Sequence, residues 1–322
     1  MDARITKQRL SNMLSYDWLK ILAAIAAAAL ALALFFTMIA TRATDGQTYM
    51  VYAYNGLSTG GDYAKFGDTI AKNGTFSYDI LNTGTEVFSD GGIYGGAVFT
   101  ARRSAGEGRV MFVSDYKTTD KDGNPTSSRL DDVAAMGLVD GGTQYEKMGM
   151  FLNPEDFLND CKAYLEAFFG AGLTREEPDE AKTREAFLAR NGNDKRFRKA
   201  KQKEAGVKLE RERLIKLKAD YLTVSEKIED GTLPYAEYKT TVPIGEETTK
   251  ENVYKIGFRM ENLTNLRNLF FYEDEVGGEK VKSSEKIVLT LFDNGDREGD
   301  LRYETVNFIA YLLKAYGNTA QE

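Results

Sequence analysis

Residues 48–55 read TYMVYAYN, and residues 109–114 read RVMFVS. Each is a short run of β-branched, aromatic and other apolar residues, and the first stops at the turn signal Asn55-Gly56. Runs of this length that are apolar on both faces are typical of strands buried between layers of helices. These two stretches therefore predict the centre of an α/β sheet.

The segments between the two runs predict how the strands are connected. A helix is expected over residues 62–72, ending at Asn73-Gly74, and a second over residues 97–104. Residues 75–81 and 85–88 alternate as strands do. The order strand, helix, strand, helix, strand predicts a mainly parallel sheet with right-handed crossovers.

The rest of the chain predicts an added helical region followed by a return to α/β structure. Asn153-Pro154-Glu155-Asp156 is a strong helix start, because it combines a cap, a proline at the first turn and acids near the positive helix end. Gly206 marks a possible break in the third helix. Helices are expected over residues 154–169, 178–190, 194–229, 263–271 and 301–315, and strands over residues 253–259 and 286–292.

Composition excludes several classes of function. The 322 residues are 42% hydrophobic and 28% charged, which indicates a folded protein. The chain has no histidine, so histidine triads and histidine-ligated metal sites are excluded. The single cysteine, Cys161, forms no intramolecular disulfide and lies on the expected apolar stripe, which favours a packed thiol over a nucleophile. The net charge of −7 argues against nucleic acid as a partner.

An apolar run near the N-terminus predicts a membrane anchor. Residues 21–40 read ILAAIAAAALALALFFTMIA, long enough to cross a bilayer as a helix, whereas a buried core helix is rarely apolar on every face. The poor cleavage site at residues 41–43 favours an uncleaved signal anchor over a signal peptide. Arg4, Lys7, Arg9 and Lys20 precede the run, so the N-terminus is expected to be cytoplasmic.

These observations predict a single-pass protein of a bacterial cell membrane, with most of the chain outside the cytoplasm. The expected parts are a cytoplasmic tail (1–20), a transmembrane signal anchor (21–41) and an extracytoplasmic α/β domain (45–322). Within that domain we distinguish a first lobe-like unit (45–116), a helical region (151–230) and a returning α/β unit (250–322). The lipid bilayer is the expected partner of residues 21–41.

The glycine-rich and acidic motifs point to no cofactor and no metal. Residues 56–61 follow the first strand, but Asp62-Tyr63 stands where a phosphate loop requires Lys-Ser/Thr, and residues 91–96 miss the dinucleotide spacing by one residue. Residues 120–124 fail as a calcium loop, and the acidic residues 293–300 are expected to form a solvated turn. A pair of carboxylates acting in catalysis stays open, but we expect no enzyme.

Six basic residues occur within residues 195–203 (KRFRKAKQK) of this acidic chain. They form either a solvated helix face or a surface that approaches anionic lipid headgroups or wall polymers.

The stretch from Thr48 to Ser114 resembles the first lobe of the type 2 extracytoplasmic solute-binding proteins of ABC importers. Residues 96–113 carry the resemblance, as a helix ending in Ala105-Gly106 before an apolar strand. The resemblance covers about 70 residues and implies two lobes that close over a small ligand by hinge motion. Two features depart from this family: Arg109, where such proteins often have aspartate, and a transmembrane anchor in place of a lipid.

Ligands of open α/β sheets bind at the carboxyl ends of the strands. Seven residues are expected there after the first and third strands: Tyr54, Asn55, Ser58, Thr59, Ser114, Asp115 and Tyr116. The leading hypothesis is thus a membrane-tethered binding domain for a small polar solute, in association with a transporter. The alternative is a non-catalytic envelope protein that keeps the fold for interaction or assembly. A ligand cleft lined by tyrosine and aspartate favours the first hypothesis, and a filled cleft with an exposed apolar or basic helical surface favours the second.

Overall fold

The computed structural model describes residues 7–8, 11, 18–39, 43–88, 95–119, 121–137, 150–243, 249–276 and 279–317, and the chain forms two compact units, Met1–Arg42 and Ala43–Glu322. In the first unit, α2 (Trp18–Ile39) is the one helix of the described residues that is long and apolar enough to cross a membrane. Its length and composition fit a membrane anchor or a signal sequence.

The second unit is built on a six-stranded sheet with the order β3-β1-β4-β9-β6-β5. Its first half is β1 (Thr48–Ala53), which pairs in parallel with both β3 (Asn82–Val87) and β4 (Val110–Ser114). The expected strands and crossover helices around residues 48–114 are confirmed, except that residues 75–81 form no strand. Phe76 and Ile80 of that segment pack on the core, while Asp79 between them is buried among arginines.

The sheet is mixed, so the expectation of a mainly parallel sheet is wrong. Strand β9 (Ile287–Leu291) is antiparallel to β4 and to β6 (Thr249–Arg259), and β6 is antiparallel to β5 (Tyr235–Pro243). Only five residues separate β5 from β6. A connection this short joins antiparallel strands, whereas a parallel pair requires a crossover of a dozen or more residues.

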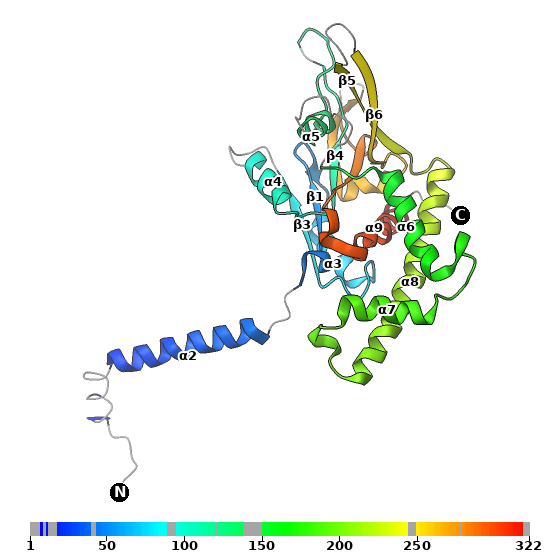
Figure 1. Ribbon diagram of the computed structural model, residues 1–322. Coiled ribbons are helices and arrows are strands. Elements are labelled where there is room, and N and C mark those ends of the chain that lie inside the picture. The colour runs from blue at the N-terminus through cyan, green and yellow to red at the C-terminus, as the bar shows by residue number, and fades with distance from the viewer. Residues whose placement is uncertain are drawn as a thin grey trace. The chain divides into compact units, whose positions relative to one another are not determined.

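Helices cover both faces of the sheet, as the strands' apolar runs predict (Figure 1). Along β1, Tyr49 and Val51 face the larger core, with α3 (Tyr63–Lys72), α6 (Pro154–Phe169), α8 (Ala200–Glu229) and α9 (Glu304–Tyr316), whereas Tyr52 faces the smaller core. The smaller core is closed by α4 (Gly95–Ser104) and α5 (Arg129–Gly137). Cys161 is buried in the larger core, as expected.

The helix expected over residues 263–271 is wrong, because part of this stretch belongs to a second, three-stranded sheet. Residues 263–271 form a 3₁₀ turn, η4 (Thr264–Asn268), followed by β7 (Phe270–Val276), which pairs with β2 (Ser58–Thr59) and β8 (Glu279–Ser283). The apolar spacing over these residues suits a helix, but a run this short fits a 3₁₀ turn leading into a strand equally well.

The helices of the helical region agree closely with those that the sequence predicts. Helix α6 has the expected bounds, and α7 (Glu180–Asn191) is separate from α8. Gly206 does not break α8; it faces Phe187, and a β-carbon there would overlap that ring. The remaining elements are 3₁₀ helices: η1 (Asp45–Gln47), η2 (Ala171–Leu173), η3 (Lys195–Phe197) and η5 (Gly295–Tyr303).

Candidate interaction surface

The structure gathers the seven expected ligand residues around the carboxyl ends of β1 and β4. The strands are neighbours, and the Tyr54 amide donates a hydrogen bond to the Phe112 carbonyl (2.8 Å). The connections from β1 and β4 therefore start side by side, which is the position where open α/β sheets bind ligands. This edge of the sheet is covered by other parts of the same chain.

Asp115 and Tyr116, which follow β4, are engaged within the protein. One carboxylate oxygen of Asp115 accepts from the Ser128 hydroxyl (3.0 Å), and the other pairs with the Arg259 guanidinium (3.1 Å). The ring of Tyr116 stacks on Tyr272 of β7, with the centroids 4.7 Å apart. These contacts use the charged and aromatic groups that a ligand would need.

The remaining residues at this edge also have internal roles. Ser58 and Thr59 form β2 and pair with β7, while the Ser114 hydroxyl accepts from the Tyr116 amide (3.1 Å). The Tyr54 ring packs edge-on against Phe99 at 5.6 Å, and Asn55 lies half-buried in the turn after β1. Strands β2 and β7 thus belong to a second sheet, while the side chains of Ser58 and Thr59 stay exposed.

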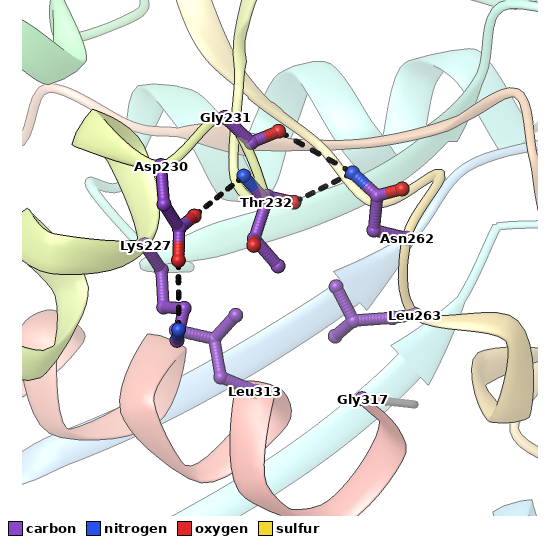
Figure 2. A pocket seen from close by; sticks show the side chains of 8 residues that line it. All are labelled: Lys227, Asp230, Gly231, Thr232, Asn262, Leu263, Leu313 and Gly317. Atoms are coloured by element: carbon purple, nitrogen blue, oxygen red, sulfur yellow. Dashed lines mark hydrogen bonds and ion pairs between the residues drawn. The ribbon is translucent and has the colours of Figure 1, made fainter. Parts of the chain in front are cut away.

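A pocket of about 460 Å³ lies elsewhere, where α8 ends beside the β6–η4 turn and α9 (Figure 2). Its polar groups bind one another: Lys227 pairs with Asp230 (2.8 Å), and the Asn262 side chain donates to the Thr232 carbonyl (2.9 Å). Hydrogen bonds from Lys227 and Thr232 lower the pKa of Asp230 to about 2. The pocket is lined by Lys227, Asp230, Gly231, Thr232, Asn262, Leu263, Leu313 and Gly317.

The two charged side chains of this pocket hold their charges at neutral pH. Asp230 stays ionised at neutral pH, and its pairing with Lys227 raises the pKa of that ammonium group. A general acid or base works best with a pKa near the operating pH, which neither group has. No group of three or more acidic or cysteine side chains in the described parts of the chain is arranged to hold a metal.

A cluster of buried and half-buried charges joins the helical region to η5, to α9 and to the loop before β3. We call it the buried arginine cluster, and it consists of Arg190, Arg196, Arg213, Asp79, Glu210, Asp300 and Glu304. Its centre is Arg213 of α8, which is fully buried and bridges Glu210 (2.9 Å) and Glu304 of α9 (3.0 Å). Charges are buried at a large cost unless they are paired, and here every member has an ionic partner.

Two residues of the acidic stretch 293–300 belong to such buried pairs, so the expected solvated turn is wrong for them. Asp300 bonds Arg190 (2.5 Å) and the Tyr164 hydroxyl (2.8 Å). Glu298 pairs with Arg109 (2.7 Å), whose guanidinium also donates to the Gly46 and Leu301 carbonyls. Arg109, the departure from the solute-binding pattern, is thus a structural link between η1 and η5.

A second pocket, of about 230 Å³, borders the buried arginine cluster through Tyr164 and Asp300. Its other lining residues are Gly295, Asp296, Gly299, Arg302 and Tyr303, and Asp300 is already bound by arginine and tyrosine. The other carboxylate of this pocket, Asp296, is exposed.

The basic segment 195–203 divides into residues that point inward and residues that point outward. Arg196 pairs with Asp79 (2.6 Å) and Asp194 (2.8 Å), and Phe197 is buried edge-on against Phe187 at 5.0 Å. The outward set is Arg198, Lys199 and Lys201, which are exposed, together with Lys203, which is half-buried. None of the four has an ion-pair partner among the residues that the structure describes. The segment is therefore fixed by two side chains and presents four unneutralised charges.

Helix α8 begins within this segment. The basic residues of the segment therefore lie at the positive end of the helix, which is an unfavourable position for them. Lys199 is the N-cap, Lys201 and Lys203 follow in the first turn, and that turn contains no acidic residue. Cations near the positive end of a helix cost about 0.3–1 kcal/mol each, and their mutual repulsion adds to this cost. Cations that conflict with the helix dipole, and that no acidic residue of the same turn balances, are typical of a functional surface.

The basic segment lies beside the start of the second unit. Both η1 and η3 contact the loop that precedes β3. The Gln47 carbonyl of η1 accepts from the Leu81 amide (2.8 Å), and Arg196 of η3 donates to the Tyr78 carbonyl (3.0 Å). Only Ala43 and Thr44 separate η1 from the first unit.

Compared with protein-family models, with curated proteins and with solved structures, the chain matches none of them. The resemblance to solute-binding proteins thus stays a prediction, with no likeness to another protein to support it.

Sequence reasoning missed the pocket of Figure 2 and the buried arginine cluster. The cluster did leave a signal: Glu210 and Arg213 fall on the apolar stripe of α8, together with Val207, Leu214 and Leu217. Charged residues of opposite sign on a buried helical stripe indicate internal ion pairs. The pocket had no comparable signal, because its lining comes from turns that are distant in sequence.

Proposed function

We propose that this protein is a membrane-tethered interaction domain. In this proposal α2 is a signal anchor in a bacterial cell membrane, the N-terminus is cytoplasmic, and Ala43–Glu322 lies outside and binds an anionic partner through the basic segment. The observation that carries the proposal is the outward set of four unpaired basic residues on an acidic protein. The internal contacts of Asp115 and Tyr116 support it further, because they engage the charged and aromatic groups that a small ligand at the β1 and β4 edge would need.

Binding to a soluble polyanion tests this proposal. We expect the full-length protein in non-ionic detergent micelles to bind a fluorescent glycerol-phosphate polymer, with an affinity that falls as salt is added, because counterions screen exposed charges. The basic-segment variant, Arg198→Gln/Lys199→Gln/Lys201→Gln/Lys203→Gln, is expected to bind at least about tenfold more weakly, since each charge near an anionic surface contributes on the order of 1 kcal/mol.

A matched control separates this surface from net charge alone. The hairpin variant, Lys121→Gln/Lys239→Gln/Lys280→Gln/Lys282→Gln, also removes four exposed basic residues, but from turns and hairpins outside the basic segment. It should keep the wild-type affinity, measured by fluorescence anisotropy. Absence of polymer binding, or equal weakening in both variants, would contradict the proposal.

A small polar solute is a second candidate partner, favoured by the volume of the pocket in Figure 2. A ligand present at 100 times its Kd adds about 2.7 kcal/mol of stability, so a metabolite screen should raise the melting temperature of the full-length protein. The variant Asn262→Leu should abolish the shift if this pocket binds the solute. The variant Asp115→Ala should abolish it if the site is the edge at β1 and β4 instead.

A further inference from the structure

We infer that the anionic partner of the basic segment is the headgroup layer of the membrane that holds α2. The inference rests on the proposed function and assigns its partner. It follows from three observations: the length of α2, the length of the connection to η1, and the position of the basic segment beside η1.

The length of α2 sets where the chain leaves the bilayer. Its 22 residues span about 33 Å at 1.5 Å per residue, close to the hydrocarbon thickness of about 30 Å. A helix of this length that crosses the membrane ends at the headgroup layer. The chain therefore enters the second unit from the membrane surface.

The connection to the second unit is short. Three residues, Ala40, Thr41 and Arg42, stand between Ile39 and Ala43. Fully extended, the steps from Ile39 to Ala43 reach at most about 14 Å. The surface around η1 is therefore confined to the immediate neighbourhood of the headgroups.

The basic segment shares that surface. It is joined to η1 by the loop before β3, because the Leu81 amide of that loop donates to the Gln47 carbonyl and the Tyr78 carbonyl accepts from Arg196. The inward contacts of Arg196 and Phe197 fix the segment in place, so little entropy is lost when its outward residues meet an anionic surface. The headgroups lie beside the end of α2 and therefore close to the basic segment. A wall polymer would first have to diffuse to this surface.

Anionic headgroups also relieve the strain in α8. Phosphate groups near Lys199, Lys201 and Lys203 offset both their mutual repulsion and their conflict with the positive end of the helix. Each basic residue close to an anionic bilayer strengthens the association by roughly fivefold, so four together change the ratio of docked to free domain by more than about a hundredfold.

Lipid nanodiscs test the inference with the full-length protein. A fluorophore is attached to Ala205→Cys, an exposed position of α8 one turn beyond Lys201, in a Cys161→Ala background. Lipids with a spin label on the headgroup quench the fluorophore only at close range. We expect strong quenching in discs of phosphatidylcholine with phosphatidylglycerol, weak quenching in phosphatidylcholine alone, and a loss of quenching at high salt.

The two variants decide the outcome. Quenching in the anionic discs should be lost in the basic-segment variant and kept in the hairpin variant. Equal quenching in both lipids, or quenching that survives in the basic-segment variant, would overturn the inference. If the protein binds the glycerol-phosphate polymer in micelles but shows no lipid-dependent quenching, the lipid assignment is wrong and the proposed interaction function stands. If it binds neither, both are wrong.

Discussion

Arg213 shows how much can depend on one buried charge. It bridges two carboxylates, Glu210 and Glu304, that are buried with it, and it donates to the Asp300 carbonyl (2.8 Å). Removing one partner of a buried ion pair leaves the other charges without compensation. Removing a surface ion costs far less, because water replaces the lost partner.

We therefore expect Arg213→Ala to lower the free energy of unfolding by about 3–5 kcal/mol. The matched control is Arg211→Ala, two residues away, whose exposed pair with Glu177 should contribute less than about 1 kcal/mol. Urea unfolding of the full-length protein in micelles measures both. Similar losses in the two variants would show that the buried ion pairs of Arg213 contribute no more to stability than an exposed pair does.

The pKa of Asp300 determines how low pH changes the stability of the buried arginine cluster. Burial raises its pKa, but Arg213, Arg190 and the Tyr164 hydroxyl outweigh burial and hold the pKa of Asp300 below its ordinary value of 3.8. A carboxyl group with a lowered pKa in the folded state adds stability above its unfolded pKa, and that stability is lost as the pH falls through the folded pKa.

The free energy of unfolding should therefore decrease as the pH falls below about 4, and the decrease should be smaller in Asp300→Asn. Glu298 contributes with the opposite sign, because burial raises its pKa above 4.5 despite Arg109, and its contribution to stability declines as the pH rises through that range. Unfolding curves between pH 3 and pH 6, a window set by roughly these pKa values, measure both effects. An unchanged pH dependence in Asp300→Asn would contradict the first.

At the scale of single elements, the same glycine substitution should have opposite effects in two helices. Alanine is favoured over glycine inside a helix by about 1 kcal/mol. Gly67 of α3 has room for a β-carbon, which would lie 3.9 Å from the Thr85 hydroxyl, whereas Gly206 of α8 lies against Phe187 and Phe197.

We expect Gly67→Ala to stabilise the protein by up to about 1 kcal/mol and Gly206→Ala to destabilise it by about 1–3 kcal/mol, because an overpacked core must shift its rings. The two melting temperatures should move in opposite directions. A stabilising effect of Gly206→Ala would mean that α8 does not pack closely on the helical region at this position.

At the scale of the whole molecule, the proposal depends on the topology of the anchor. With α2 as an uncleaved signal anchor, protease added to intact cells should destroy the second unit and leave a short N-terminal fragment, detected through an N-terminal tag. This orientation, with the N-terminus in the cytoplasm, is expected because basic residues precede α2 and are nearly absent from the residues that follow it. If the second unit resists protease until the cells are lysed, it lies in the cytoplasm, and the proposed topology is wrong.

The sequence by itself determined the features that depend on local patterns. The apolar run of α2, the strands β1, β4 and β9, the start of α6 and the burial of Cys161 all follow from periodicity and capping, which act within a few residues. The adjacency of the carboxyl ends of β1 and β4 also followed, because the two runs were expected to be parallel strands of one sheet.

Only the tertiary structure decided how these pieces pair and what each surface is left to do. The direction of β9, β6 and β5, the second sheet over the β1 and β4 edge, and the buried arginine cluster all join residues that are far apart in the chain. Lys199 and Arg196 look alike in sequence, yet one is an exposed helix cap and the other is bound to Asp79. The physical reason is that a charge is stabilised by whichever group the fold brings within a few ångströms, and sequence patterns specify faces of elements but not their distant neighbours.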